Sequence, residues 1–441
     1  MGLRVTRENL VPLTAIAPYF ALGLVSFLAA PWVLAIGSAS LDGGFYRDTA
    51  ILAAVHLYAL GWGTAVALGA LQQMTAVVFA TVLHSPRLAK AAFVVFILGL
   101  SGLITGFATL PQLGIARVAL AAAALGLPLG AVLALANVYL TLRNGQPTER
   151  GNLIRPFVLS AGGYLVLALL AGAALAVNLA TGWLGLAWRS TLALHVAAAA
   201  GGWFLMLVIG ISYHLLTFFG LVEKKHQFRW PGAVRRLLHA GAGLVIVAAV
   251  LRAAGTERVP VTEPVARAAL ATAAWAVAAA CVLFVWDGWG IYAPREPARM
   301  HPGVGYVRAA HSYLLACALV LAGFGLAGVL GSPAPAQGLT ALGFLAAAGW
   351  LSNTILGYLH RILPFVVWHN RYWGRAREPG VPAFRHMVHQ PMAWAACAVY
   401  NAGVAGAAVA LVSAWPTGPF LALLGAGAAL AALNLFRTLL K

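Results

Sequence analysis

The chain alternates between long apolar runs and short polar connections from beginning to end. A helix that crosses a lipid bilayer needs about 20 mostly apolar residues. The connections between the runs, such as 143–156 and 292–303, are polar and rich in Pro and Gly. The pattern therefore predicts an all-α membrane protein with twelve transmembrane helices in a single membrane domain, 1–441. The predicted spans are 11–37, 50–83, 91–110, 114–142, 157–180, 190–219, 238–254, 264–285, 305–330, 336–367, 390–414 and 419–436.

Composition agrees with this pattern and excludes a soluble globule. Of the 441 residues, 62% are hydrophobic and only 9% are charged, whereas a soluble domain has about 25% charged residues. The outer surface must therefore face lipid, and the lipid bilayer is the first predicted partner.

The net charge of +18 is a topology signal. With twelve spans both termini lie on one side, and most of the 28 Lys and Arg residues lie on that side too. The positive-inside rule then predicts cytoplasmic N- and C-termini in a bacterial-type inner (plasma) membrane. Because membrane topology accounts for the positive charge, this charge argues against a nucleic-acid partner. The basic residues predicted on the other side are Arg47, Arg117, Arg189, Arg252, Arg258 and Arg267.

Three segments repeat one pattern. The ranges 61–79, 202–220 and 349–367 each open with Gly-Trp and have a second glycine eight positions later. A polar side chain follows at offset eleven or twelve: Gln72 and Gln73, His214, or His360. The spacing predicts three pseudo-repeated four-helix units, at about 1–150, 151–301 and 302–441. Glycines spaced in this way predict close approach to another helix.

Histidines within the spans are the candidate functional residues, because ionisable groups are costly in lipid and usually face the bundle interior. His56 and His195 lie in the predicted outer halves of spans 2 and 6, in apolar surroundings without a nearby carboxylate. Two imidazoles in such a place favour haem iron or copper over a zinc hydrolase site. Hydrogen bonding between helices is the alternative role for this pair.

A second group of histidines is predicted near the inner ends of the spans, and comprises His214, His239, His311 and His360. These are either interfacial histidines or, for His214, His311 and His360, a reserve cofactor site. The spans contain no carboxylate near the predicted midplane, which argues against an ion-coupled transporter.

Twelve spans, cytoplasmic termini, three four-helix units and histidines on helices 2 and 6 together resemble subunit I of the haem-copper oxidases. The resemblance implies that His56 corresponds to a low-spin haem ligand and His195 to a copper ligand. The family also carries a His-His pair on helix 7 and a His-x-His on helix 10, whereas 245–255 and 341–349 contain no histidine. The chain is also similar to twelve-span haem- and copper-containing membrane proteins linked to nitric oxide stress, which lack parts of the oxidase set.

The sequence thus predicts a b-type haem protein with His56 and His195 as ligands and without a complete oxygen-reducing centre. Electron transfer, or nitric oxide or haem handling, is the expected role, with a redox partner or a small gas as the other participant. Whether the chain is an oxidoreductase stays open, as does homo-oligomer formation. The alternatives are a cofactor-free transporter or scaffold on the same fold, and a copper-handling membrane protein.

Overall fold

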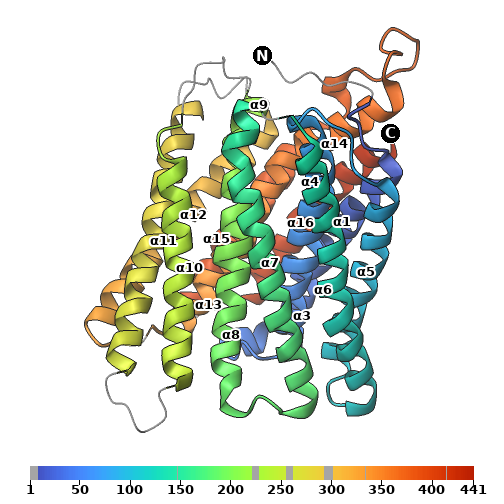
Figure 1. Cartoon of the computed structure of the whole chain (residues 1–441). Coiled ribbons are helices and arrows are strands. Elements are labelled where there is room, and N and C mark those ends of the chain that lie inside the picture. Colours follow the sequence, from blue (N-terminus) through green and yellow to red (C-terminus); the bar gives the residue numbers. More distant parts are fainter. Residues whose placement is uncertain are drawn as a thin grey trace.

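The computed structural model describes residues 8–146, 148–220, 228–254, 262–292, 301–332, 334–413 and 415–441. Within these ranges the chain is helical without strands, and twelve helices are long and apolar enough to cross a membrane (Figure 1). This confirms the predicted all-helical class and the number of spans. Nine spans are single helices: α1 (Leu13–Ile36), α5 (Pro86–Ala108), α6 (Leu113–Asn144), α7 (Glu149–Thr181), α10 (Pro231–Ala254), α11 (Thr262–Tyr292), α12 (Pro302–Val329), α15 (Gln390–Val412) and α16 (Gly418–Leu440).

Spans 2, 6 and 10 are each built from two α-helices joined end to end by a π-helical segment. Span 2 is α3 (Thr49–His56), η1 (Leu57–Thr64) and α4 (Ala65–Val78). Span 6 is α8 (Trp188–Val196), η3 (Ala197–Leu205) and α9 (Met206–Gly220), and span 10 is α13 (Ala336–Phe344), η5 (Leu345–Leu351) and α14 (Ser352–Tyr372). Each π segment contains one of the Gly-Trp pairs. Short elements outside the spans are α2 (Ser38–Asp42), η2 (Gly185–Ala187) and η6 (Phe384–His386).

Capping residues move several helix ends away from the ranges that hydropathy predicts. Span 5 begins at Glu149, before the predicted 157, because the Thr148 hydroxyl accepts the N–H of Gly151 at 2.9 Å. Span 2 ends at Val78 rather than 83, and Ala80 beyond it has a positive φ of 47°, which a helix cannot continue through. Polar first turns thus extend helices beyond their apolar stretch.

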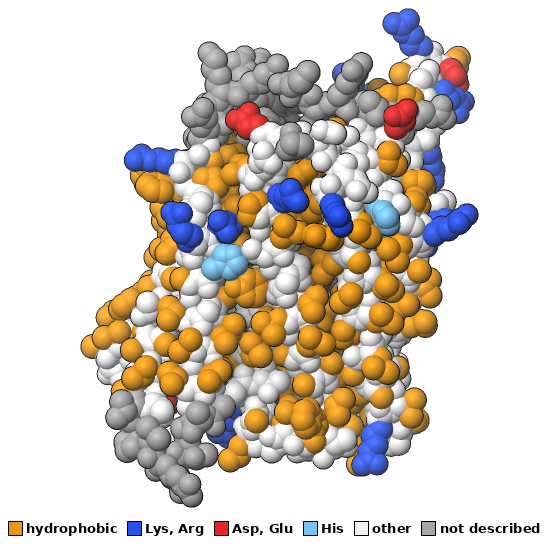
Figure 2. All heavy atoms as spheres, viewed as in Figure 1, with side chains coloured by type: hydrophobic (Ala, Val, Ile, Leu, Met, Phe, Trp, Pro, Cys, Tyr) orange, Lys and Arg blue, Asp and Glu red, His pale blue; other side chains and the backbone are white. Residues whose placement is uncertain are grey.

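The two ends of the bundle differ in charge. The first described helix, α1, starts beside the end of span 10, because the N–H of Leu13 donates to the side-chain oxygen of Asn370. The Arg371 side chain reaches the carbonyl of Leu440 at 2.7 Å. Lys and Arg gather towards this end on the face shown in Figure 2, and apolar side chains cover the middle. We call it the basic end, and the opposite one, with α3 and α8, the far end (Figure 1).

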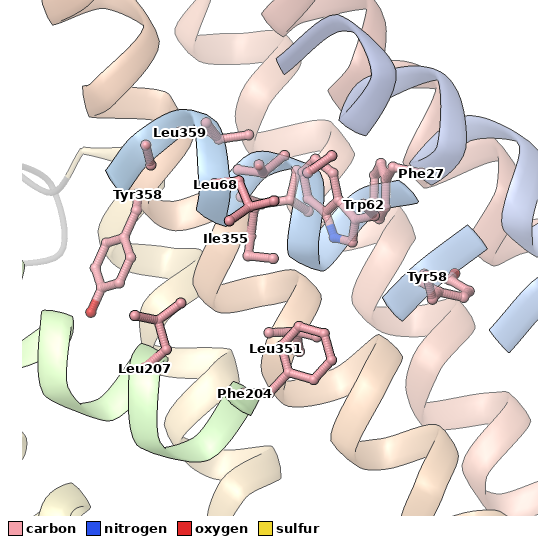
Figure 3. Packing of buried hydrophobic residues seen from close by; sticks show 14 of the residues in the cluster. Phe27, Tyr58, Trp62, Leu68, Phe204, Leu207, Leu351, Ile355, Tyr358 and Leu359 are labelled. Atoms are coloured by element: carbon pink, nitrogen blue, oxygen red, sulfur yellow. The ribbon is translucent and has the colours of Figure 1, made fainter. Parts of the chain in front are cut away.

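Spans 2, 6 and 10 meet at buried tryptophans. The Trp62 indole N–H donates to Ser352 at 3.2 Å, and that of Trp203 donates to Thr64 at 3.0 Å. Thr64 and Ser352 each lie three residues after the first glycine of their segment. The residue at the same place in span 6 is Leu205, whose side chain has no hydrogen-bond acceptor. Figure 3 shows side chains of all three spans packed together here, with Phe27 stacked on Trp62 at 4.5 Å.

The repeated glycines lie where other helices come closest, as their spacing predicts. A Cβ at Gly61, Gly202 or Gly349 would collide with a side chain of the preceding span: Ser26, Tyr164 and Tyr313 respectively. The second glycines behave in the same way. A Cβ at Gly69 would press on Tyr19, at Gly210 on Phe157 and at Gly357 on Val307.

Three buried polar residues near the basic end hold the starts of neighbouring helices. Asn137 accepts the N–H of Ser85 and donates to its carbonyl, both at 2.9 Å. Asn434 makes the same two bonds to His389, at 3.1 and 3.0 Å. Asp287 accepts the N–H groups of Arg229 and Trp230, each at 3.0 Å. This bonding explains why α10 begins at Pro231, ahead of the predicted 238.

We expect Ser352→Ala to destabilise the protein by about 1–2 kcal/mol, because the buried Trp62 indole N–H would lose the acceptor that it has among the described residues. Unfolding in mixed detergent measures the change. The control is Ser312→Ala, because the exposed Ser312 hydroxyl bonds only within its own helix, and we expect that variant to stay within about 0.5 kcal/mol of wild type. Equal stability of the two variants would contradict a structural role for the Trp62 bond.

Candidate functional site

His56 is the last residue of α3, directly before the π segment of span 2. Its Nδ1 lies 2.7 Å from the carbonyl oxygen of Leu52. A carbonyl only accepts, so Nδ1 carries the proton and Nε2 of the neutral ring keeps its lone pair. The ring of Phe107, on α5, lies 5.1 Å from the imidazole, centre to centre. The histidine is therefore held in one tautomer and against one wall.

His195 is held in the same way by a different helix. It lies on α8, and its Nδ1 is 2.8 Å from the carbonyl oxygen of Ala168 on α7. Gly172, one turn further along α7, provides room for the ring: a Cβ there would lie 2.9 Å from the imidazole Cε1. Its Nε2 likewise keeps the lone pair. A metal-binding histidine is usually oriented by just such a bond from its other nitrogen to a backbone carbonyl.

The structure brings these two predicted residues together. The imidazole centres of His56 and His195 are 6.2 Å apart, and the ring planes differ by 18°. Two imidazoles that bind one metal ion from opposite sides, with metal–nitrogen bonds of about 2.0 Å, have their ring centres about 6 Å apart. The pair thus has the separation of a two-histidine metal site.

Packing around the pair is open compared with the rest of the same span. Both histidines are only half buried, and none of the residues of α8 is buried. The continuation of span 6 is close-packed, with Met206, Leu207 and Ile209 fully covered. The end of span 6 that carries His195 is therefore loosely enclosed by protein, whereas the end that carries His214 is tightly enclosed.

The three reserve histidines are buried and do not form one group. His214 lies on α9, whereas His311 lies on α12 against α11, with its ring 5.4 Å from that of Phe284. His360, on α14, stacks on Tyr306 with ring centres 5.2 Å apart. Among the described residues there is no group of three or more His, Cys, Asp or Glu side chains that could hold a metal ion.

His239, from the same predicted inner group, forms hydrogen bonds between helices. One ring nitrogen lies 3.1 Å from the Ser160 hydroxyl and the other 3.0 Å from the Tyr164 hydroxyl, both on α7. Both nitrogens are thus engaged, and the ring has none left for a metal ion.

Two parts of the His56 and His195 site have no signal in the sequence. Gly172 lies in an Ala- and Gly-rich stretch, 171–174, in which nothing marks it as the glycine beside a histidine. The carbonyl of Ala168 is a backbone group, so residue type cannot reveal it. Both become evident only when α7 is placed against α8.

His301 caps the start of α12 at the basic end, where its Nδ1 accepts the N–H of Gly303 at 3.1 Å. Burial lowers the pKa of His301 from 6.5 to about 3, with smaller effects from Arg361 and His360. The unfolded chain therefore takes up a proton below about pH 6.5, which the folded protein refuses until about pH 3. Stability is fully present above the upper value and falls as the pH drops between the two.

We expect His301→Ser to lessen the loss of thermal stability on acidification. Serine keeps an oxygen that can cap α12 and removes the titrating group. The measurement is the difference in Tm between about pH 7 and pH 4 for both proteins. The same drop in wild type and variant would show that His301 does not contribute to acid sensitivity.

Sequence comparison adds no family assignment: no protein-family model and no curated protein matches the chain.

Proposed function

We propose that the chain is a membrane protein that binds one b-type haem between His56 and His195 and works in electron transfer. The observation that carries this proposal is the pair of nearly parallel imidazoles whose ring centres lie 6.2 Å apart, each with Nδ1 bonded to a backbone carbonyl. Each ring then directs a lone pair, rather than an N–H, away from its anchor.

The number of protein ligands favours haem over a bare metal ion. A structural zinc site needs four ligands and a catalytic one three, more than the two histidines that meet here. A porphyrin supplies its own four nitrogens, so haem iron needs only one or two axial ligands from the protein. The residues of α8 are incompletely covered by the rest of the protein, whereas His360 is fully enclosed.

Such a haem, when bound, would accept and release one electron. His56 and His195 would hold this haem, and a haem held by two imidazoles would supply electron transfer rather than gas reduction. The stretches 245–254 and 341–349 add no further histidine ligand. His56 lies seven residues into α3, about 10 Å from its start, so a redox partner would dock at the far end.

We further propose that the chain consists of three four-helix units, 1–150, 151–301 and 302–441. The support is geometric: the π segments, the glycine contacts and the residues Asn137, Asp287 and Asn434 recur in the same places of each unit. With cytoplasmic termini, as the positive-inside rule predicts, the far end and its histidine pair would face the outside of a bacterial-type inner membrane.

The test is the optical spectrum of the purified protein, produced with haem available. We expect the absorbance bands of haem with two imidazole ligands and about one haem per chain. A preparation without haem bands would refute the proposal. Copper found by metal analysis of that colourless preparation would favour the second candidate, a two-imidazole copper site, because imidazole also suits copper.

A further inference from the structure

Two arginine side chains lie against one tryptophan at the far end of the bundle. Arg47 is in the turn before α3, and its guanidinium carbon lies 4.6 Å from the centre of the Trp188 ring. Trp188 is the first residue of α8, and the guanidinium carbon of Arg189, the next residue, lies 5.7 Å from the same centre. The face of an aromatic ring attracts cations, so Trp188 gathers one positive charge from span 2 and one from span 6.

Neither of these charges is neutralised by a carboxylate in the described part of the chain. Arg252 and Arg267, also at the far end, both pair with Glu263, at 2.8 and 3.9 Å. Arg47 and Arg189, by contrast, form no ion pair and no side-chain hydrogen bond with a described residue. The two arginines that meet over Trp188 thus differ from the pair on α10 and α11 in having no acidic partner there.

Asp48, the carboxylate next to Arg47 in the sequence, has other partners. Its oxygens accept the Ser40 hydroxyl and the N–H of Ala50, each at 2.8 Å, and it thereby caps the start of α3. Arg47 and Arg189 are both exposed, so a group from outside the chain can reach them. Two guanidinium groups that converge without an acceptor among the described residues form a site for an anion.

Phosphate is the anion that a lipid membrane provides at the level of this site. Trp188 begins α8, and Arg47 comes two residues before α3 begins at Thr49, so the arginines lie where two spans enter the membrane (Figure 1). Lipid headgroups lie at this depth, where tryptophan is also enriched. The planar fork of a guanidinium group matches the oxygens of a phosphate with two parallel hydrogen bonds. A phospholipid therefore has the charge and the geometry that this pair of arginines recognises.

The helix that begins at Trp188 is only partly covered by protein, as a lipid-binding surface requires. α8 packs against α7 and α10, yet none of its residues is buried. Apolar side chains in and before this helix are exposed, to 60% at Trp183, 85% at Leu186 and 52% at Val196. Acyl chains that lie against such side chains bury apolar surface, so the neighbourhood of the two arginines suits both parts of a lipid.

We propose that Arg47, Trp188 and Arg189 bind the headgroup of an anionic phospholipid, with its phosphate held by both guanidinium groups. A headgroup with a net negative charge balances the two arginines better than a zwitterionic one. The positive-inside rule does not account for this site, because it gathers Lys and Arg at the opposite, basic end. One bound lipid joins the starts of spans 2 and 6, which are the spans that carry His56 and His195.

Titration of the purified full chain in detergent with phosphatidylglycerol tests the site, and native mass spectrometry counts the lipids bound per chain. At the lipid concentration that just saturates the wild type, we expect Arg47→Gln and Arg189→Gln each to bind one lipid fewer. The affinity of the site should fall by about tenfold or more when one of its two guanidinium groups is lost. The matched control is Arg117→Gln, because Arg117 is exposed at the same end and stacks on no aromatic ring of the described residues. This control should bind as many lipids as the wild type.

Phosphatidylcholine, which has a phosphate but no net charge, should leave this site of the wild type empty at the same concentration. Equal numbers of the two lipids on the wild type, or the wild-type number of phosphatidylglycerol molecules on both variants, would overturn the proposal. Arg47 and Arg189 are exposed, so their replacement should leave the fold intact, and thermal unfolding without added lipid checks this. No histidine is changed, so the lipid site and the haem proposal fail separately.

Discussion

Removing His56 and His195 together should leave the purified protein without haem. Each single alanine variant should retain less than about a tenth of the wild-type haem after washing, because one of the two imidazoles that would hold the haem is lost. The residual haem, with one imidazole, should have a changed spectrum. Haem content per chain, measured by absorbance, gives the result. Unchanged haem content in the double variant would refute the assignment of these ligands.

His239→Ala is the matched histidine control for this experiment. His239 is bonded at both nitrogens to α7, so its loss should lower stability and leave haem content unchanged. A loss of haem from this variant equal to that of His56→Ala would mean that the effect follows general unfolding.

Gly172→Val tests the position of His195 without removing a ligand. The added side chain would meet the imidazole and push it from its place, which should weaken haem binding by about tenfold or more. Gly163→Val is its control on the same helix, because Gly163 is exposed and has open space around it. Similar haem affinity in both variants would show that the orientation of His195 is unimportant.

The second large effect is expected at Gly202. In Gly202→Ala the new methyl group would collide with Cβ and Cγ of Tyr164, atoms too near the backbone to swing away. We expect a loss of about 1–3 kcal/mol in unfolding free energy, as is usual for overpacking. Unfolding in mixed detergent or thermal unfolding measures it.

Gly201 is the matched control, one residue away in the same π segment. A Cβ at Gly201 would meet nothing within 4 Å. Gly201→Ala should therefore be neutral, or stabilise by up to about 1 kcal/mol through helix propensity. Equal destabilisation by both substitutions would mean that the π segment itself, rather than the contact with Tyr164, requires glycine.

Much of the fold could be predicted from residue order. Lipid leaves backbone groups no partner outside the helix, so a long apolar run has little choice of structure. In the part of the chain that the structure describes, the twelve runs became twelve helical spans for this reason. The ends were less accurate where a side chain caps a polar turn, as Thr148 does for α7 and Asp287 for α10.

The candidate site was predictable only in part. An imidazole in an apolar span is costly enough to mark His56 and His195 as unusual, and their residue types limit the metals that suit them. Their offsets from the two Gly-Trp pairs differ, however, so no periodicity predicts that the rings meet. The same offset likewise gives a linking role to Gln72, whereas Nε2 of His360 makes no hydrogen bond to another described residue.

Residue order was enough to predict the number of spans, the all-helical class and the glycines at close helix contacts, because each depends on local hydropathy or on the lack of a side chain. The packing of the helices is what places His56 beside His195 and leaves Nε2 of His360 and the Tyr306 hydroxyl without a hydrogen bond in the described part of the chain. These properties depend on which residue of another helix lies across a few ångströms of space. Neighbours in space come from all parts of the chain, and the order of residues along one helix does not specify them.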